Sequence, residues 1–399
     1  MKSYKFKLFP TEEQKEKLEL SLDICRRTYN HLLSELSNGF NKNELSNYLL
    51  DLKVCYPEMK QVYSKVLQVE NDKLFSNLSG LSASKKNGNR IGRLRFKGKG
   101  WKKTFCYNQS GFKVLKGNKK NNQLHLAKIG DIKLILHRKI EGEIKQIIIK
   151  REVDNWYAII QTDAVIKLEC GNKEIGIDMS PSKFGVTSDG EIINMPKEID
   201  ISLQKLKKAH TNLSRKKKGS KNGLKAKKLL QKRYWRLNNQ KDNFYHQTSY
   251  KLIKECKVIG IEDLSIKGMM MGCYNNKNFQ KSGWYTFITK YLTYKAESAN
   301  CQIWACDRFE PTTQRCSCCE KINPTKLELK DRIFNCPFCG LVLDRDVNAS
   351  CNINKYCRQG TCLCGVDSST LEKEQESVLK QEKISMNLIH REAHSDIWR

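Results

Sequence analysis

Apolar side chains divide the first half of the chain into a strand, a helical segment and a further run of strands. Residues 2–9 alternate between polar and apolar side chains, which predicts one strand with a buried face. A helix is expected to follow, with Thr11 as its N-cap and Gln14 completing a capping box. Its buried stripe recurs at helical spacing, at Leu18, Leu22, Cys25, Tyr29, Leu32 and Leu36.

A second helical region is predicted over roughly 43–80, and alternating patterns return over 104–166. The later pattern indicates a series of antiparallel strands. The first strand precedes the helices and can pair with these later strands. The helices would then be an insertion in a β-barrel.

From residue 173 the pattern changes to short, wholly apolar strands. Ile175–Ile177 ends in Asp178, and Val258–Ile261 ends in Glu262. Between them the sequence predicts a hairpin with an Asp189–Gly190 turn and a very basic helical hairpin over 200–255. Further elements are expected over 284–299 (helix), 302–306 (strand) and 346–356 (final helix), followed by a charged tail over 367–399.

The net charge of +30 exceeds what solubility requires. It favours a polyanionic partner, because each phosphate contact releases condensed counterions. A merely solvated, lysine-rich surface is the alternative. One Gly- and Lys-rich loop, SKKNGNRIGRLRFKGKGWKK, carries Phe96 and Trp101 among its cations. Such a loop suits a nucleic-acid strand, unless its aromatic residues return to the core, and the sequence leaves both possibilities open.

Four of the 17 cysteines have the spacing of a zinc ribbon. Two Cys-x-x-Cys pairs, Cys316/Cys319 and Cys336/Cys339, would present four thiolates to one tetrahedral Zn²⁺. The first residues, MKSYKFKLFP, hold no apolar signal core, and no stretch of about 18 apolar residues occurs. We therefore expect a reducing cytoplasmic environment, with localisation at the nucleoid, in place of a disulfide framework.

Three acids are candidates for a second metal site: Asp178, Glu262 and Asp346. A strand–hairpin–helix–strand order is what an RNase H-like fold needs to bring such acids together at one edge of a mixed sheet. Close carboxylates repel each other unless divalent cations neutralise them, and oxygen ligands suit Mg²⁺ or Mn²⁺. Two such ions can activate water and stabilise the leaving oxygen of a phosphodiester.

Each acid also has a purely structural interpretation. Asp178 could be a strand-end turn residue, Glu262 could begin a loop, and Asp346 could cap a helix. Three neighbouring acids are expected to be non-catalytic: Asp189 in a hairpin turn, Asp344 as a supporting or loop acid, and Asp263 facing away from Glu262.

Several motifs occur in a fixed order along the chain: YKFKLFPTEEQ near the start, CRRTYN (25–30), GRLRFK (92–97), GIDMSPSKFGVTSDG (176–190), LSRKKKGSKN (213–222), GIEDLSIKGM (260–269) and LDRDVNASCNI after the cysteine pairs. In these motifs, up to about residue 357, the chain resembles the TnpB (OrfB) proteins of bacterial insertion sequences. That family comprises RNA-guided DNA endonucleases related to the miniature type V CRISPR nucleases.

The resemblance implies an α+β multidomain fold. Its parts would be a wedge-type β-barrel (1–10 and 90–166), an inserted helical recognition bundle (11–89), a RuvC-like nuclease domain (167–310 and 344–357), a zinc ribbon (311–343) and a flexible tail (358–399). The family's catalytic acids fall on Asp178, Glu262 and Asp346.

The partners implied by the resemblance are a guide RNA derived from the element and target double-stranded DNA, with no membrane. The protein itself would read a short flanking DNA motif. Two other functions remain open: a non-cleaving RNA-guided DNA-binding regulator, and a transposase acting directly on the element's ends.

The chain departs from the family pattern at a few positions. Glu320 stands where glycine is usual after the first cysteine pair, and Cys318 adds a possible competing thiolate. None of the departures removes a ligand or a catalytic acid, so we expect an active enzyme. The late cysteines Cys351, Cys357, Cys362 and Cys364 show no regular four-ligand spacing, and we expect them to be incidental thiols.

Overall fold

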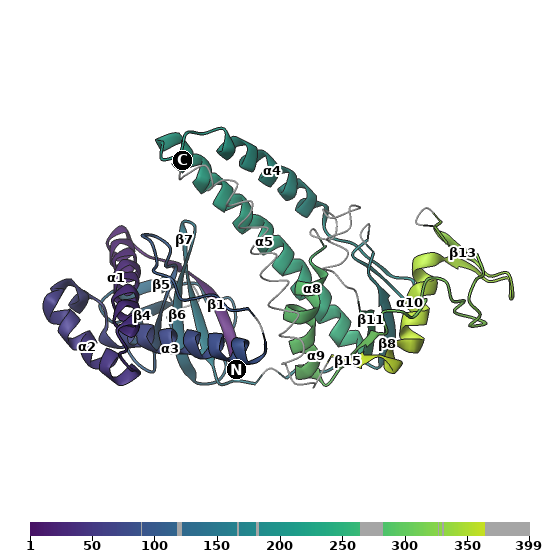
Figure 1. Cartoon of the computed structure of the whole chain (residues 1–399), viewed down its shortest axis with the longest axis horizontal. Coiled ribbons are helices and arrows are strands. Elements are labelled where there is room, and N and C mark those ends of the chain that lie inside the picture. The colour runs from purple at the N-terminus through teal and green to yellow at the C-terminus, as the bar shows by residue number, and fades with distance from the viewer. Residues whose placement is uncertain are drawn as a thin grey trace. The chain divides into compact units, whose positions relative to one another are not determined.

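The computed structural model describes residues 1–88, 90–117, 122–165, 167–180, 183–263, 282–325, 327–328 and 331–363. The chain divides into two compact units, Met1–Ile166 and Lys167–Arg399 (Figure 1). Both units mix helices with a β-sheet, and each has its own hydrophobic core. None of the helices in the described part of the chain combines the length and the hydropathy that crossing a bilayer requires.

The first unit is built on a seven-stranded antiparallel sheet with the order β2-β6-β7-β1-β5-β4-β3. The strands are β1 (Lys2–Phe9), β2 (Thr104–Asn108), β3 (Phe112–Leu115), β4 (Gln123–Leu126), β5 (Gly130–Leu134), β6 (Ile144–Glu152) and β7 (Asn155–Thr162). Strand β1 lies between β7 and β5, so the expected pairing of the first strand with the later ones is confirmed. Its alternate residues Tyr4, Phe6 and Leu8 are buried, as the pattern predicts.

Three helices join β1 to β2: α1 (Glu12–Ser37), α2 (Lys42–Cys55) and α3 (Ser64–Lys86). The capping box predicted for α1 is present, since Thr11 and Gln14 exchange side-chain and backbone hydrogen bonds. The helical region expected over 43–80 is divided by a 3₁₀ turn at Pro57–Gln61, because proline disfavours helical backbone in the residue before it.

The second unit is built on a six-stranded mixed sheet with the order β10-β9-β8-β11-β12-β15. The strands are β8 (Lys173–Asp178), β9 (Gly185–Thr187), β10 (Ile192–Ile193), β11 (Cys256–Glu262), β12 (Gln302–Cys306) and β15 (Thr361–Cys362). Strands β8, β11 and β12 are parallel to one another. Strand β9 is antiparallel to β8, β10 is antiparallel to β9, and β15 is antiparallel to β12. Strand β15 lies in the segment assigned to the tail, so ordered structure continues to residue 362, and residues 364–399 lie outside the described part.

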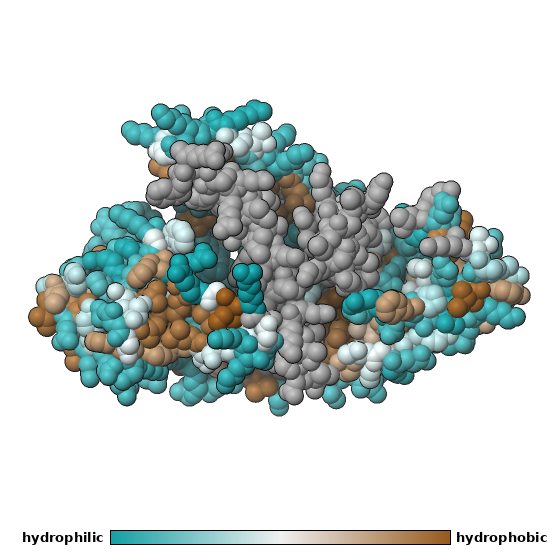
Figure 2. Space-filling view, viewed as in Figure 1, coloured by the Kyte–Doolittle hydropathy of each residue, from teal (hydrophilic) through white to brown (hydrophobic). Residues whose placement is uncertain are grey.

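Within the described residues, the α-helices of this unit are α4 (Lys197–Ser214), α5 (Lys221–Glu255), α8 (Trp284–Thr286), α9 (Thr293–Ala299) and α10 (Arg345–Tyr356), with a π-helical turn at Phe287–Leu292 between α8 and α9. Helices α4 and α5 form the predicted basic hairpin (Figure 1). At its turn, Arg215–Lys218 are all exposed, and the visible surface at this end of the hairpin is hydrophilic (Figure 2). A small two-stranded sheet, β13 (Ile333–Asn335) with β14 (Val342–Asp344), precedes α10.

Candidate functional site

Asp178 and Glu262 end two neighbouring parallel strands, on the sheet face that helix α10 covers. Gly176 and Gly260 are direct partners in the β8–β11 ladder, and each acid stands two residues further along, on the same face. A Cβ atom on Gly176 would lie 2.0 Å from the carbonyl oxygen of Ser350, and one on Gly260 would lie 3.1 Å from another carbonyl oxygen of the same helix. Helix α10 therefore rests directly on the two glycines beside the acids.

The opposite face of the same strands carries the hydrophobic core. Ile175 and Ile177 on β8, with Ile259 and Ile261 on β11, pack among residues of α5, the π-turn and α9. Along each strand, isoleucines that face the core alternate with a glycine and an acid that face α10. Strands with a wholly apolar sequence can therefore still end in an acid.

Helix α10 supplies the third acid in its first turn. The Oδ1 atom of Asp344 accepts hydrogen bonds from the backbone N–H groups of Asp346 (2.9 Å) and Val347 (3.3 Å), so Asp344 is the N-cap. Asp346, which the structural interpretation placed in that capping role, is instead free to face the sheet and is only 3% exposed. The signal for the cap was present in the sequence, because an aspartate just before a helix is a preferred N-cap.

The three carboxylates influence one another. Burial raises the pKa of Asp178 well above its usual range, and the charges of Glu262 and Asp346 raise it further. Burial also raises the pKa of Glu262, against the effect of the Thr312 hydroxyl, which donates to Glu262 Oε1 at 2.9 Å. Three ionised acids here are unfavourable without positive charge, which is the condition that makes a group of carboxylates a cation site.

Basic side chains partly supply that charge. The Nζ atom of Lys183 lies 3.2 Å from Asp346 Oδ2 and 3.9 Å from Asp344 Oδ2, and Arg345 lies 3.6 Å from Asp346 Oδ1. The motif that contains Lys183 was recognised in the sequence, but nothing in it indicated a contact with an acid 163 residues away.

The four cysteines predicted as zinc ligands do come together. Their sulfur atoms all lie within 4.8 Å of one another, with 3.6 Å between Cys316 and Cys339 and 3.5 Å between Cys319 and Cys336. Four sulfurs at about 2.3 Å from a tetrahedral Zn²⁺ would be about 3.8 Å apart, so this donor set fits zinc. No other group of three or more histidine, cysteine or acidic ligand atoms within the described ranges is as compact, and the three acids are more widely spread.

The two cysteine turns share one hydrogen-bond pattern. Cys316 N–H donates to Lys321 O and Glu320 N–H to Cys316 O, and Cys336 and Gly340 repeat the arrangement. Gly340 has a φ of +73° and Glu320 a φ of +63°, a conformation that costs a residue with a side chain about 1–2 kcal/mol. The replacement of the usual glycine by Glu320 therefore strains the backbone of the first cysteine turn.

The side chain of Glu320 also connects the first cysteine turn to the end of α10. It pairs with Lys355 and accepts a hydrogen bond of 2.9 Å from the Tyr356 hydroxyl. A glycine at this position would relax the backbone but would lose both contacts.

Two asparagines on α10 fasten the start of the ribbon to the helix. The buried side chain of Asn348 accepts from Ser317 N–H (2.9 Å) and donates to Arg315 O (2.7 Å). That of Asn352 donates to the carbonyl oxygens of Thr312 (2.8 Å) and Arg315. The Thr312 hydroxyl in turn contacts Glu262. These positioning residues were not identified from the sequence, although Asn348 lies within the motif that follows the ribbon.

The remaining acids and cysteines lie as follows. Asp189 is in the β9–β10 turn, and Asp263 pairs with Arg308 at 2.7 Å. Among the late cysteines, Cys357 is buried against Gly260, Cys351 donates to Ser188 O at 3.6 Å, and Cys362 is in β15; Cys364 lies outside the described residues.

Three family models match the chain in order. A helix-turn-helix model of the OrfB type matches residues 1–44, the OrfB model described as "Probable transposase" matches 152–271, and "Cas12f1-like, TNB domain" matches 284–353. The second and third matches contain the three acids and the four cysteines.

Two curated relatives are similar over most of their length. One, from Streptomyces pristinaespiralis, is named "Putative RNA-guided DNA endonuclease" and is 25% identical over 88% of this chain and 88% of its own. The other, "Putative RNA-guided DNA endonuclease InsQ" from Escherichia coli K12, is 24% identical over 88% and 91%. A solved Cas12f1–sgRNA–target DNA complex covers 88% of this chain and 98% of its own at 16% identity, but a TM-score of 0.33 is too low to establish a common fold.

Proposed function

We propose that this chain, a member of the OrfB family of insertion-sequence proteins, is an RNA-guided, metal-dependent DNA endonuclease. The observation that carries the proposal is the approach of Asp178, Glu262 and Asp346 on one sheet face, where burial and the charges of the other two acids raise the pKa of Asp178. The names of the two curated relatives point to the same activity.

In this proposal the acids hold Mg²⁺ or Mn²⁺, which suit oxygen ligands. When bound, such ions supply an activated water and neutralise the charge that develops on the leaving 3′ oxygen of a phosphodiester. The protein's own part is to hold the carboxylates in place, through the paired glycines, the Asp344 cap and the Thr312 hydroxyl. Lys183 would exchange its contact with Asp346 for a substrate phosphate or solvent when the ions bind.

Cys316, Cys319, Cys336 and Cys339 would hold a structural Zn²⁺. It would contribute to the folding of the ribbon and not to catalysis, because four thiolates complete the coordination of the ion and leave no open position for substrate. Through Asn348 and Asn352 the folded ribbon would then help to keep Asp346 in place.

The family's domain names can be assigned to the described elements. We assign the seven-stranded sheet to the wedge-type β-barrel (1–10 and 90–166), α1–α3 to the recognition bundle (11–89), and the six-stranded sheet with its helices to the RuvC-like domain. The sheet order supports the last assignment, since three parallel strands with an antiparallel hairpin on the β8 side bring strand-end acids together.

The proposed partners are a guide RNA from the element and its double-stranded DNA target. The exposed cations at the α4–α5 turn and in the loop before β2 supply sequence-independent phosphate contacts. Guide pairing would supply the sequence specificity.

The decisive experiment is to purify the full chain, sequence the RNA that copurifies, and assay cleavage of matching DNA in Mg²⁺. Asp178→Ala, Glu262→Ala and Asp346→Ala should each abolish cutting while RNA stays bound. Asp263→Ala is the matched control, because this acid neighbours Glu262 but pairs with Arg308, and it should cut normally.

The outcomes separate the competing functions. Bound element RNA and guided DNA binding without cutting would indicate the non-cleaving regulator. Excision of the element by the protein without RNA would indicate a transposase. Cleavage by all three alanine variants would rule out this active site.

A further inference from the structure

The basic loop between α3 and β2 is fixed at two points. The side chain of Asn30 donates to Lys97 O (3.1 Å) and accepts from Lys97 N–H (2.8 Å), and Lys97 Nζ lies 3.6 Å from the centre of the Tyr29 ring. Five residues later, Lys102 is buried and pairs with the fully buried Glu70 of α3. The loop is therefore held in place by contacts with helices α1 and α3.

Fixing the loop at these points leaves its two aromatic rings outside the core. Phe96 is 60% exposed and Trp101 is 71% exposed, while Leu94 packs against the core of the first unit. Of the two possibilities that the sequence left open, the described structure favours the one in which Phe96 and Trp101 are exposed and available to a ligand. An aromatic ring on a backbone that is already ordered can stack on a ligand at little entropic cost.

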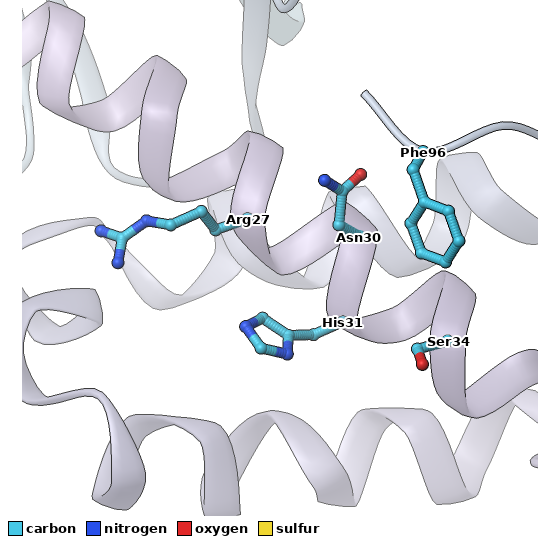
Figure 3. A pocket seen from close by; sticks show the side chains of 5 residues that line it. All are labelled: Arg27, Asn30, His31, Ser34 and Phe96. Carbon is cyan, nitrogen blue, oxygen red and sulfur yellow. The ribbon is translucent and has the colours of Figure 1, made fainter. Parts of the chain in front are cut away.

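Phe96 forms one wall of a pocket of about 300 Å³. The other walls come from one face of α1, where Arg27, Asn30, His31 and Ser34 follow one another at helical spacing (Figure 3). The volume is at the lower end of the range for small-molecule sites, so it suits one aromatic ring system and not a long ligand.

The charges in and around the pocket indicate that a neutral group would enter it and that a negatively charged group would remain outside. Arg27 already pairs with Glu58 at 2.6 Å, so the pocket is not a cradle for an anion. The surrounding segment, residues 84–103, contains nine lysines and arginines and no acid, and Arg93 and Arg95 beside Phe96 are exposed. A ligand with a neutral ring inside the pocket and negative charge outside it matches a nucleotide, with its base inside and its phosphate outside.

We propose that this pocket binds one unstacked base of a single-stranded nucleic acid, with the base on the Phe96 ring and the adjoining phosphates on Arg93 and Arg95. The proposal rests on the proposed function only in taking nucleic acid as the partner. Base stacking on an exposed aromatic ring is tolerant of sequence, so the site would hold the strand and would not read it.

The test measures binding of the full-length protein to fluorescent 20-nucleotide oligo-uridine and oligo-deoxythymidine and to a 20-base-pair DNA duplex, at several salt concentrations. Phe96→Ala should weaken binding of the single strands by about 5- to 150-fold, the equivalent of about 1–3 kcal/mol of stacking, and should leave the salt dependence unchanged. Phe96→Tyr should bind as the parent protein does. Arg93→Ala should weaken binding of all three probes and reduce the salt slope by about one.

Controls keep this result specific. Phe9→Ala removes another exposed ring of the same unit, outside the pocket, and should bind normally. Photocrosslinking of 4-thiouridine or 5-iodouracil probes should label Phe96 or His31, and the stronger of the RNA and DNA signals identifies the natural source of the base.

Three results would overturn the proposal: equal affinity of Phe96→Ala and the parent protein, equal loss on the duplex and the single strands, or crosslinks only outside the pocket. A parent protein that binds no nucleic acid would instead contradict the proposed function itself. Thermal melting shows whether each variant is folded, and the exposure of Phe96, Phe9 and Arg93 predicts that all of them are.

Discussion

Replacing Gly176 by alanine tests whether helix α10 must rest directly on the sheet. The added Cβ atom would lie 2.0 Å from Ser350 O and 2.4 Å from Asn354 N, which are backbone atoms that cannot rotate away. To reach the 3.0 Å that real Cβ contacts require, the helix must withdraw by about 1 Å. Asp346, one turn before Ser350 on the same helix, would move with it.

Two measurements should change together. Overpacking of this kind costs about 1–3 kcal/mol, which urea denaturation of the second unit should detect. A displacement of about 1 Å at a catalytic group can lower the rate by about 100-fold, which single-turnover cleavage of DNA that matches the guide RNA should detect. Gly80→Ala is the matched control: it lies in helix α3 with nothing within 4 Å, and it should gain up to about 1 kcal/mol and cut normally. If Gly176→Ala melted and cut as the parent protein does, the direct packing of α10 on β8 would be refuted.

Two further predictions concern the proposed metal sites. The purified protein should carry one zinc by elemental analysis, which Cys316→Ser should remove and Cys318→Ser should retain, because Cys318 is exposed and not part of the four-sulfur cluster; loss in both variants would contradict this ligand set. In metal-free protein the pKa of Asp178 is raised by burial and by the charges of Glu262 and Asp346. Above the unfolded pKa of about 3.9, the folded state therefore binds more protons than the unfolded state, and the free energy of unfolding falls as pH rises. Asp178→Asn should therefore raise the melting temperature more at pH 7 than at pH 4, and should remove the stabilisation that Mg²⁺ gives the parent protein. An equal gain at both pH values would show that the ionised Asp178 carboxylate does not destabilise the folded state.

Local chemistry in the sequence was sufficient to predict most elements of both units. The Thr11–Gln14 capping box lies within four residues, the cysteine turns within a few more, and apolar strands that end in acids are visible as short patterns. Pro57 also carried the signal for the break between α2 and α3, which the prediction of one helical region passed over.

What could not be predicted depends on contacts between distant segments. The role of Gly176 and Gly260 becomes visible only when their strands pair in register and a third segment lies across them. The bonds from Asn348 and Asn352 to the start of the ribbon, and the contact of Thr312 with Glu262, join residues 30 to 50 positions apart. No local pattern specifies such pairs, because a buried asparagine can satisfy its hydrogen bonds in many ways.

The spacing of the three acids has a consequence for how the protein matures. Asp178 and Glu262 are 84 residues apart, and Asp346 follows after another 84. Contacts of such long range form late, and the N-terminal part of a chain folds first during synthesis. The first unit, with its basic loop, can thus be complete on the ribosome while the proposed cutting site does not yet exist. Nascent and truncated chains would bind nucleic acid before they could cleave it.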